Sequence, residues 1–266
     1  MDVVRPRTLA EALTLKAELP PESRFIQGGT DVMVELNFDH SRPPALIDLN
    51  AVGELRGWRR EGDTVVLGAG LTYTELMQSE VASLFPALAA ASRTVGSPQI
   101  RNRGTIGGNL ATASPAGDSL PPLLVDEALV ELQSLRGTRT MRLDEFLTGV
   151  KRTAIAPDEL VTAVRLPARD TVAPQTFMKV GTRNAMVIAV CSLAVLVDRE
   201  RDEIRAAFGS ASPVATLVRL PLDEADSLPA RVVASSSPID DVRGTAQYRR
   251  HALGILAGRA LSRCLA

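Results

Sequence analysis

The sequence has little of the residue types on which many active sites depend. Its 266 residues include two cysteines and two histidines, and aromatic residues make up 3% of the chain. Cys191 and Cys264 lie far apart inside apolar patterns, which argues against a disulfide framework or a cysteine-ligated metal cluster on this chain alone. His40 lies in a polar loop and His251 in a terminal helix, so we expect both to be solvated and find no basis for a histidine triad.

An excess of charge and a long apolar run are also missing. Thirty Lys and Arg against 31 Asp and Glu leave a formal net charge of −1, so no basic field favours nucleic acid or a membrane surface. No stretch reaches the roughly 18 apolar residues of a membrane span, and the first residues lack the pattern of a secretory signal. We therefore expect a soluble, cytoplasmic protein.

What is present is enough apolar sequence for a sizeable core. Hydrophobic residues make up 45% of the chain, and at roughly 100 to 200 residues per domain this length predicts two domains. Apolar spacing and capping boxes predict helices at 8–19, 81–95, 144–147 and 246–265. Alternating or continuous apolar runs predict strands at 24–27, 45–49, 55–60, 64–68, 128–132, 139–143, 159–167, 187–197 and 203–208.

This mixture predicts an α+β fold with a domain boundary near residue 170. The first domain is expected to span residues 1–170, in subdomains of about 1–52 and 53–170, and a second domain 171–266. The segment 223–241 is expected to be short and irregular.

The stretch 97–118 is too rich in glycine, proline and small hydroxyl residues for a buried helix or strand, so we predict a folded loop. Gly104, Gly107 and Gly108 permit positive φ and close approach, so that several backbone N–H groups can turn toward one anion. The hydroxyl and amide groups beside them belong to Thr105, Asn109, Thr112 and Ser114. We expect the bound anion to be a phosphate.

A second glycine pair, Gly28-Gly29, follows a short apolar run in the same way. Either pair alone is most often a simple turn, but two such loops can converge on the two phosphates of a dinucleotide. Neither matches the spacing of a Rossmann turn or of a lysine-bearing phosphate loop, which indicates an unrelated fold. Asp118 can accept hydrogen bonds from sugar hydroxyls or cap the next turn, and Lys179 fits a solvated strand better than a ligand contact.

Three motifs follow one another in a specific order. They are Ile26-Gln27-Gly28-Gly29-Thr30-Asp31, then Ile100-Arg101-Asn102-Arg103-Gly104-Thr105-Ile106-Gly107-Gly108-Asn109-Leu110-Ala111, then Ala113-Ser114-Pro115-Ala116-Gly117-Asp118. Together they resemble the FAD-binding subunit of the xanthine dehydrogenase and carbon monoxide dehydrogenase family of molybdenum hydroxylases. The resemblance extends to Phe177-Met178-Lys179-Val180-Gly181 with Arg183, to Ala207-Phe208-Gly209 and to Tyr248-Arg249-Arg250-His251.

The resemblance implies a flavin fold of the vanillyl-alcohol-oxidase (PCMH) type, with two α/β subdomains that hold an extended FAD and a small C-terminal α+β domain. It also implies that 25–32 and 105–109 cradle the pyrophosphate, that Asp118 holds ribityl or ribose hydroxyls, and that Val161 and Lys179 lie near the cofactor. The implied FAD-binding residues are Phe25, Ile26, Gln27, Gly28, Gly29, Thr30, Asp31, Val32, Val95, Thr105, Ile106, Gly107, Gly108, Asn109, Ser114, Asp118, Val161 and Lys179.

The function implied by the resemblance is electron transfer within a hetero-oligomer. An iron–sulfur small subunit would pass electrons from its [2Fe–2S] clusters to FAD, a molybdopterin large subunit would oxidise the substrate, and NAD⁺, O₂ or a quinone would accept the electrons. Two alternatives stay open: a self-contained flavin reductase acting on a sugar nucleotide, and a non-enzymatic nucleotide-binding interaction subunit.

Overall fold

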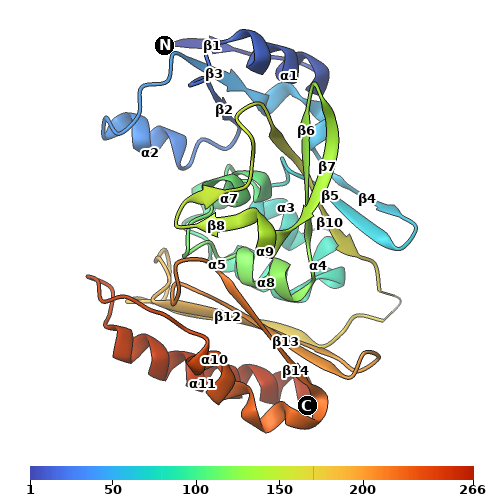
Figure 1. Ribbon diagram of the computed structural model, residues 1–266, viewed down its shortest axis with the longest axis vertical. Coiled ribbons are helices and arrows are strands. Elements are labelled where there is room, and N and C mark those ends of the chain that lie inside the picture. The colour runs from blue at the N-terminus through green and yellow to red at the C-terminus, as the bar shows by residue number, and fades with distance from the viewer. Residues whose placement is uncertain (79, 170) are drawn as a thin grey trace.

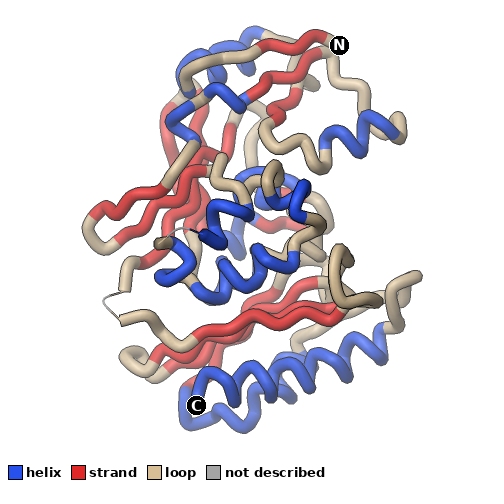
Figure 2. The backbone as a smooth tube through the Cα atoms, turned by 180° about the vertical axis from the view of Figure 1, so that it is seen from behind, coloured by secondary structure: helices blue, strands red, loops and turns tan. Residues whose placement is uncertain are grey.

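The structure is a computed structural model that describes residues 1–78, 80–169 and 171–266. Figure 1 shows three tiers along the longest axis, which begin with the N-terminal segment and end with the C-terminal helix. Each tier contains its own β-sheet, and helices fill the space between the second and third sheets (Figure 2). The predicted α+β class is therefore confirmed. Among the described residues, no helix is long and apolar enough to cross a membrane.

The first tier is a small parallel sheet with one helix packed on it. Its strand order is β1-β3-β2, formed by β1 (Asp2–Val4), β3 (Ala45–Asp48) and β2 (Arg24–Ile26). Helix α1 (Leu9–Glu18) begins at Thr8, whose hydroxyl accepts the N–H of Glu11, and it buries Ala12 and Leu13 against Ile47. The remaining helical elements are α2 (Val32–Asn37), η1 (Leu49–Ala51) and η2 (Gly53–Leu55).

The second tier is an antiparallel sheet of order β4-β5-β10-β6-β7. Its strands are β4 (Trp58–Glu61), β5 (Thr64–Gly68), β10 (Leu160–Pro167), β6 (Leu129–Ser134) and β7 (Gly137–Arg142). Seven short helices accompany this sheet among the described residues: α3 (Tyr73–Gln78), α4 (Val81–Leu84), α5 (Pro86–Thr94), α6 (Pro98–Arg101), α7 (Ile106–Thr112), α8 (Leu120–Val125) and α9 (Leu143–Phe146). A small hairpin joins β8 (Leu147–Gly149) to β9 (Arg152–Thr153).

Two predictions for this tier are wrong. The predicted loop 97–118 contains helices α6 and α7, because Ile106 and Leu110 are fully buried and make one face of α7 part of the core. The predicted helix 81–95 is divided into α4 and α5, because Pro86 starts a new helix.

The third tier is an antiparallel sheet of order β11-β12-β13-β14. Its strands are β11 (Gln175–Val180), β12 (Cys191–Asp198), β13 (Glu203–Gly209) and β14 (Thr216–Pro221). Helices α10 (Leu228–Ala234) and α11 (Ala246–Leu265) cover its outer face, after the 3₁₀ segment η3 (Leu222–Ser227). The segment 223–241, expected to be irregular, thus contains a complete helix.

The position of strand β12 between two cores explains its continuous apolar sequence. Leu193 and Val195 belong to the core under α10 and α11, whereas Ala194 and Leu196 belong to the core shared with the second tier. Both faces of the strand are buried, so the usual alternation of polar and apolar residues disappears. The strand was predicted to start at residue 187 but starts at Cys191.

The domain boundary predicted near residue 170 coincides with Asp170, which lies outside the described residues. The flanking strands belong to different sheets, since β10 ends at Pro167 in the second sheet and β11 begins at Gln175 in the third. The division into 1–170 and 171–266 stays a prediction.

A cluster of charged side chains joins the turn after α8 to the third sheet. Arg205 on β13 is fully buried, with one guanidinium nitrogen 2.5 Å from Glu127 Oε2 and another 2.7 Å from Asp198 Oδ2. Arg219 and Arg201 also pair with Glu127. Burial alone would raise the pKa of Glu127, but hydrogen bonding from Arg219 and the arginine charges outweigh it and lower that pKa from 4.5 to about 2.

Replacing Arg205 is therefore expected to loosen the third tier. Arg205→Met should lower the free energy of unfolding by about 3–5 kcal/mol, because Glu127 and Asp198 lose their shared buried cation. Arg201→Met is the matched control; its side chain is 59% exposed, and its loss should cost about 1 kcal/mol or less. Chemical denaturation measures both, and equal losses would contradict the role of the buried cluster.

The same cluster predicts the direction of a pH dependence. Because the folded-state pKa of Glu127 lies below its ordinary value, its contribution is complete above pH 4.5 and is lost as the pH falls toward 2. Denaturation curves between these pH values should show a smaller acid-induced loss in Arg205→Met than in the unchanged chain. An identical pH profile for the two proteins would contradict the coupling.

Candidate cofactor site

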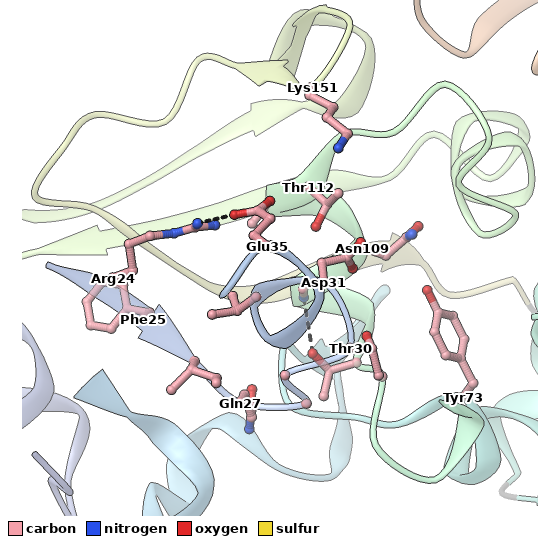
Figure 3. Close-up of a pocket in the computed structure, with 18 residues that line it drawn as sticks. Arg24, Phe25, Gln27, Thr30, Asp31, Glu35, Tyr73, Asn109, Thr112 and Lys151 are labelled. Atoms are coloured by element: carbon pink, nitrogen blue, oxygen red, sulfur yellow. Dashed lines mark hydrogen bonds and ion pairs between the residues drawn. The ribbon is translucent and has the colours of Figure 1, made fainter. Parts of the chain in front are cut away.

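A cleft opens where the turn after β2 faces α7 (Figure 3). Its volume is about 230 Å³. The lining residues come from β2 and the following turn, α2, α3, α7 and the turn before β9, and they are Arg24, Phe25, Ile26, Gln27, Gly28, Gly29, Thr30, Asp31, Val32, Glu35, Tyr73, Gly104, Thr105, Gly108, Asn109, Ala111, Thr112 and Lys151. The two glycine motifs, about 80 residues apart in the chain, therefore line one site.

The first glycine turn offers a row of unused hydrogen-bond donors. In the described part of the chain, the backbone N–H groups of residues 28–31 have no acceptor. Gly29 has φ +74°, and a Cβ added to Gly28 would lie 2.2 Å from the Arg103 carbonyl oxygen. The turn therefore needs glycine at position 29 for the positive φ and at position 28 for the close approach to Arg103. Consecutive free N–H groups of this kind suit an anion.

Contrary to our expectation, the glycines of the second motif do not present free N–H groups to an anion. The N–H groups of residues 106–108 donate to the carbonyls of Leu71 and Ala69 and to the Thr105 hydroxyl, so they are already paired within the protein. Gly107 allows α7 to pack closely, because a Cβ there would lie 2.6 Å from the Cβ of Ala69. Gly108 faces the cleft, where a Cβ would meet only Thr105 Oγ1 within 4 Å.

Polar side chains complete the rim of the cleft. An ion pair joins Arg24 on β2 to Glu35 on α2, on the far side of the cleft from Tyr73. Figure 3 shows Lys151 extending toward Thr112 of α7. The hydroxyl end of Tyr73 points into the cleft in the same view, although the residue is only 4% exposed. These lining residues provide a cation and hydroxyl groups around the row of free N–H groups.

A buried ion pair links the second tier to the third next to this cleft. Lys179 Nζ on β11 lies 2.5 Å from Asp118 Oδ2 and also donates to the Thr94 carbonyl oxygen. Burial raises the pKa of Asp118, while the charge of Lys179 and the hydrogen bonds from Lys179 and Thr94 oppose that shift. The other carboxylate oxygen, Oδ1, is buried and has no partner among the described residues. A hydroxyl group of a ligand would satisfy it.

Lys179 also lines a second cavity of about 840 Å³ between α5–α6 and the loop after β11. Thr94, Gly96, Arg101, Arg183 and Met186 contribute to its lining. Tyr73 lines the first cleft, whereas Lys179, the partner of Asp118, lines the second cavity. Together the two cavities offer room for an extended ligand.

The structure gathers most, but not all, of the predicted site residues. Residues 25–32, Thr105, Gly108 and Asn109 line the first cleft. Ile106 and Gly107 are buried beneath it, Val161 lies in the core on β10, and Ser114 lines a separate cavity. Val95 is half-buried between two residues that line the second cavity, Thr94 and Gly96. The individual binding roles stay predictions.

Seven lining residues are absent from the implied FAD-binding set. Gly104, Ala111 and Thr112 belong to the stretch 97–118, and the other four are Arg24, Glu35, Tyr73 and Lys151. Each of these four stands outside a glycine motif, and only folding brings it to the cleft. The Thr72 hydroxyl accepts the N–H of Glu75 at the start of α3, a local pattern that carries no sign of the contact between the Tyr73 ring and Gly104. Lys179 was expected to be solvated, yet its side chain is 7% exposed.

Fold and site together define a dinucleotide-binding α+β protein of non-Rossmann type. Residues 1–169 match the family described as FAD binding domain in molybdopterin dehydrogenase, and the chain belongs to this family. The predicted fold class and the resemblance stated from the motifs are thereby confirmed. The chain is an FAD-binding subunit of an oxidoreductase of the molybdenum hydroxylase family.

Similarity extends beyond the matched domain. The chain is 39% identical over 202 residues to the nicotinate dehydrogenase FAD-subunit of Eubacterium barkeri, an alignment that covers 73% of this chain and 68% of that protein. It is 31% identical over 278 residues to the carbon monoxide dehydrogenase medium chain of Afipia carboxidovorans, covering 100% and 96%. A solved structure of carbon monoxide dehydrogenase from Hydrogenophaga pseudoflava superposes with a TM-score of 0.92 at 28% identity, covering 100% of this chain and 97% of that one.

The residues present fit FAD on three observations. The free N–H groups at 28–31 suit a pyrophosphate, the space beside Gly108 admits a ligand, and Asp118 Oδ1 lacks the donor that a sugar or ribityl hydroxyl provides. Lys179 holds Oδ2 of the same carboxylate, which leaves Oδ1 as the oxygen that a ligand hydroxyl would satisfy.

Filling the space at Gly108 is expected to abolish FAD binding. Gly108→Val should weaken FAD affinity by at least tenfold, about 1.4 kcal/mol, because its side chain extends into the cleft. Gly53→Val is the matched control, since a Cβ at Gly53 meets nothing within 4 Å and Gly53 lies outside the cleft. Fluorescence titration of the apoprotein measures both, and unchanged affinity in Gly108→Val would remove α7 from the site.

Replacing only Lys179 is expected to lower the stability of the chain more than replacing Asp118 and Lys179 together. Lys179→Met should destabilise the chain by about 3–5 kcal/mol, since the Asp118 carboxylate is left buried without its cation. The double variant Asp118→Asn/Lys179→Met should recover much of that loss in thermal unfolding without FAD. Additive losses in this cycle would show that the two side chains are not coupled.

Proposed function

We propose that this chain holds FAD in extended form across the two cavities and relays electrons for a larger complex. The pyrophosphate lies against residues 28–31, the sugar and ribityl hydroxyls near Asp118, and the flavin ring toward the second cavity beside Lys179. The observation that carries this proposal is the row of free N–H groups opposite the open face of Gly108, in a chain that belongs to an FAD-binding family.

The bound FAD would supply the electron-transfer chemistry, and the protein supplies its placement. The backbone N–H groups of residues 28–31 would hold the anionic end of the cofactor. Asp118 would hold the middle of the cofactor and Lys179 would lie beside its flavin end, while Ile106 and Leu110 fix α7 in the core beneath the cleft. This division of tasks explains why a redox subunit can function with so few catalytic side chains.

We propose further that the electrons come from [2Fe–2S] clusters of an iron–sulfur small subunit, while a molybdopterin large subunit oxidises the substrate. The names of its relatives support a multi-subunit enzyme, since they are called subunits or medium chains of dehydrogenases. NAD⁺, O₂ or a quinone is the proposed acceptor. The expected cytoplasmic location and heterotrimeric assembly belong to the same proposal.

The test is to purify the tagged chain from its native host with whatever it binds. We expect a yellow complex that contains an iron–sulfur subunit and a molybdopterin subunit. Removing FAD from that complex should leave cluster reduction by substrate intact but stop electron delivery to the acceptor, which absorbance changes of clusters and acceptor report separately. Restoring FAD should restore delivery in the unchanged chain and not in Gly108→Val.

Two results would overturn the relay. A yellow chain that purifies alone and reduces a sugar nucleotide with a nicotinamide would favour the self-contained reductase. A colourless chain that takes up no FAD, yet assembles normally, would favour the non-enzymatic interaction subunit.

A further inference from the structure

A third cavity lies where the loop before Asp118 meets the third tier, outside the proposed FAD site. Its volume is about 230 Å³, several times the roughly 30 Å³ that a water molecule occupies in the liquid. The segment 114–116 forms one wall, and the loops 210–213 and 237–243 form the others. The cavity therefore has room for a ligand, and it is lined from both the second and the third tier.

The buried end of this cavity is polar and incompletely paired. Ser210 is 8% exposed, and its hydroxyl oxygen has no hydrogen-bond partner among the described residues. Arg249 is 1% exposed and its Nε likewise lacks a partner, although its other nitrogens donate to the Val190 and Ser210 carbonyls and to Asp241. Buried polar groups left without partners are rare and call for an explanation.

Ser210 is also held in an unfavourable backbone conformation. Its φ is 60°, a region that residues other than glycine seldom occupy. Its N–H donates to the Pro115 carbonyl at 2.7 Å and its carbonyl accepts from Arg249 at 2.6 Å, so the backbone is fixed from both walls. The strain places an unused hydroxyl at the buried end of the cavity, a combination that is common in binding sites.

Charge and wall chemistry together indicate the kind of ligand. Arg243 and Arg249 both line the cavity, and no carboxylate is among the described residues that line it; their shared partner, Asp241, lies outside the lining. Toward the outside the lining becomes apolar, with Val150 55% and Ile239 66% exposed. A ligand that fits carries a negative charge at one end and an apolar body at the other.

We propose that this cavity binds a carboxylate on an apolar body, with the carboxylate hydrogen-bonded by Ser210 and Arg249 and the body against Val150 and Ile239. This cavity shares no lining residue with the two cavities proposed for FAD, although Ser114 of the implied FAD-binding set is part of its wall, and the proposal does not rest on the electron relay. A free organic acid and an acidic side chain of a partner subunit present the same chemistry, and the experiment distinguishes these two sources.

The probe is benzoate, titrated into the full-length, FAD-loaded chain by calorimetry, with benzamide as the uncharged comparison. We expect benzoate to bind with a dissociation constant of about 1 mM or below, and benzamide to bind at least about tenfold more weakly. Benzoate that shows no binding at about 10 mM, or that binds no better than benzamide, overturns the proposal.

Two variants locate the binding. Ser210→Gly removes the hydroxyl while suiting the positive φ, and it should weaken benzoate binding about tenfold. Arg243→Gln should weaken it as well, because the cavity loses one of its two lining cations. Ser227→Ala is the matched control: its hydroxyl is also buried without a partner, but it lies outside the cavity. Unchanged benzoate affinity in Ser210→Gly overturns the proposal.

The assembled complex then reveals the source of the carboxylate. If benzoate binds to the complex as tightly as to the chain alone, the natural ligand is a free acid. If assembly blocks benzoate, and Ile239→Glu weakens assembly by adding a like charge, the carboxylate comes from a partner subunit. Both results support the carboxylate site. Whether the site exists is decided beforehand, by the benzoate titrations of the isolated chain.

Discussion

The backbone contact between the two glycine motifs is the constraint on which the cleft depends. Gly28 lies so close to the Arg103 carbonyl that even one added carbon would collide with it. Arg103 in turn donates to the Gln27 carbonyl, and Asn50 donates to the same oxygen, so the first turn is held against the approach to α7. The N–H groups of residues 28–31 have no partner in the described chain. The two motifs therefore line one cleft although they belong to different tiers.

The third tier is joined to the second by charge as well as by apolar packing. Its inner face shares a core with α5 and α8, while Arg205 and Lys179 pair with the Glu127 and Asp118 carboxylates of the second tier. Buried pairs of this kind add little net stability, but each is costly to break from one side. They consequently specify where β11 and β13 lie relative to α8. The Asp118–Lys179 pair thereby places Lys179 at the edge of the proposed cofactor site.

The site is built for binding rather than for chemistry by its own side chains. Its lining offers free N–H groups, hydroxyls, one lysine and an ion pair, and both histidines are exposed elsewhere. A cofactor that performs its own redox chemistry requires placement and electrostatic balance from the protein. Asp118 illustrates the balance: burial raises the pKa of its carboxyl group, the charge and hydrogen bond of Lys179 oppose that shift without cancelling it, and Oδ1 has no partner among the described residues.

The sequence by itself determined the α+β class, most of the strands and the two glycine motifs, because these depend on local periodicity and on glycine's lack of a side chain. It also determined the family, since the ordered motifs are specific. Only the tertiary structure decided that Gly107 serves packing while Gly108 faces the cleft, because that difference depends on Ala69, which lies 38 residues earlier in the chain. It likewise decided that Lys179 is buried beside Asp118, and that Tyr73 and Lys151 reach the cleft. Such contacts join distant segments, and no local pattern in the chain records them.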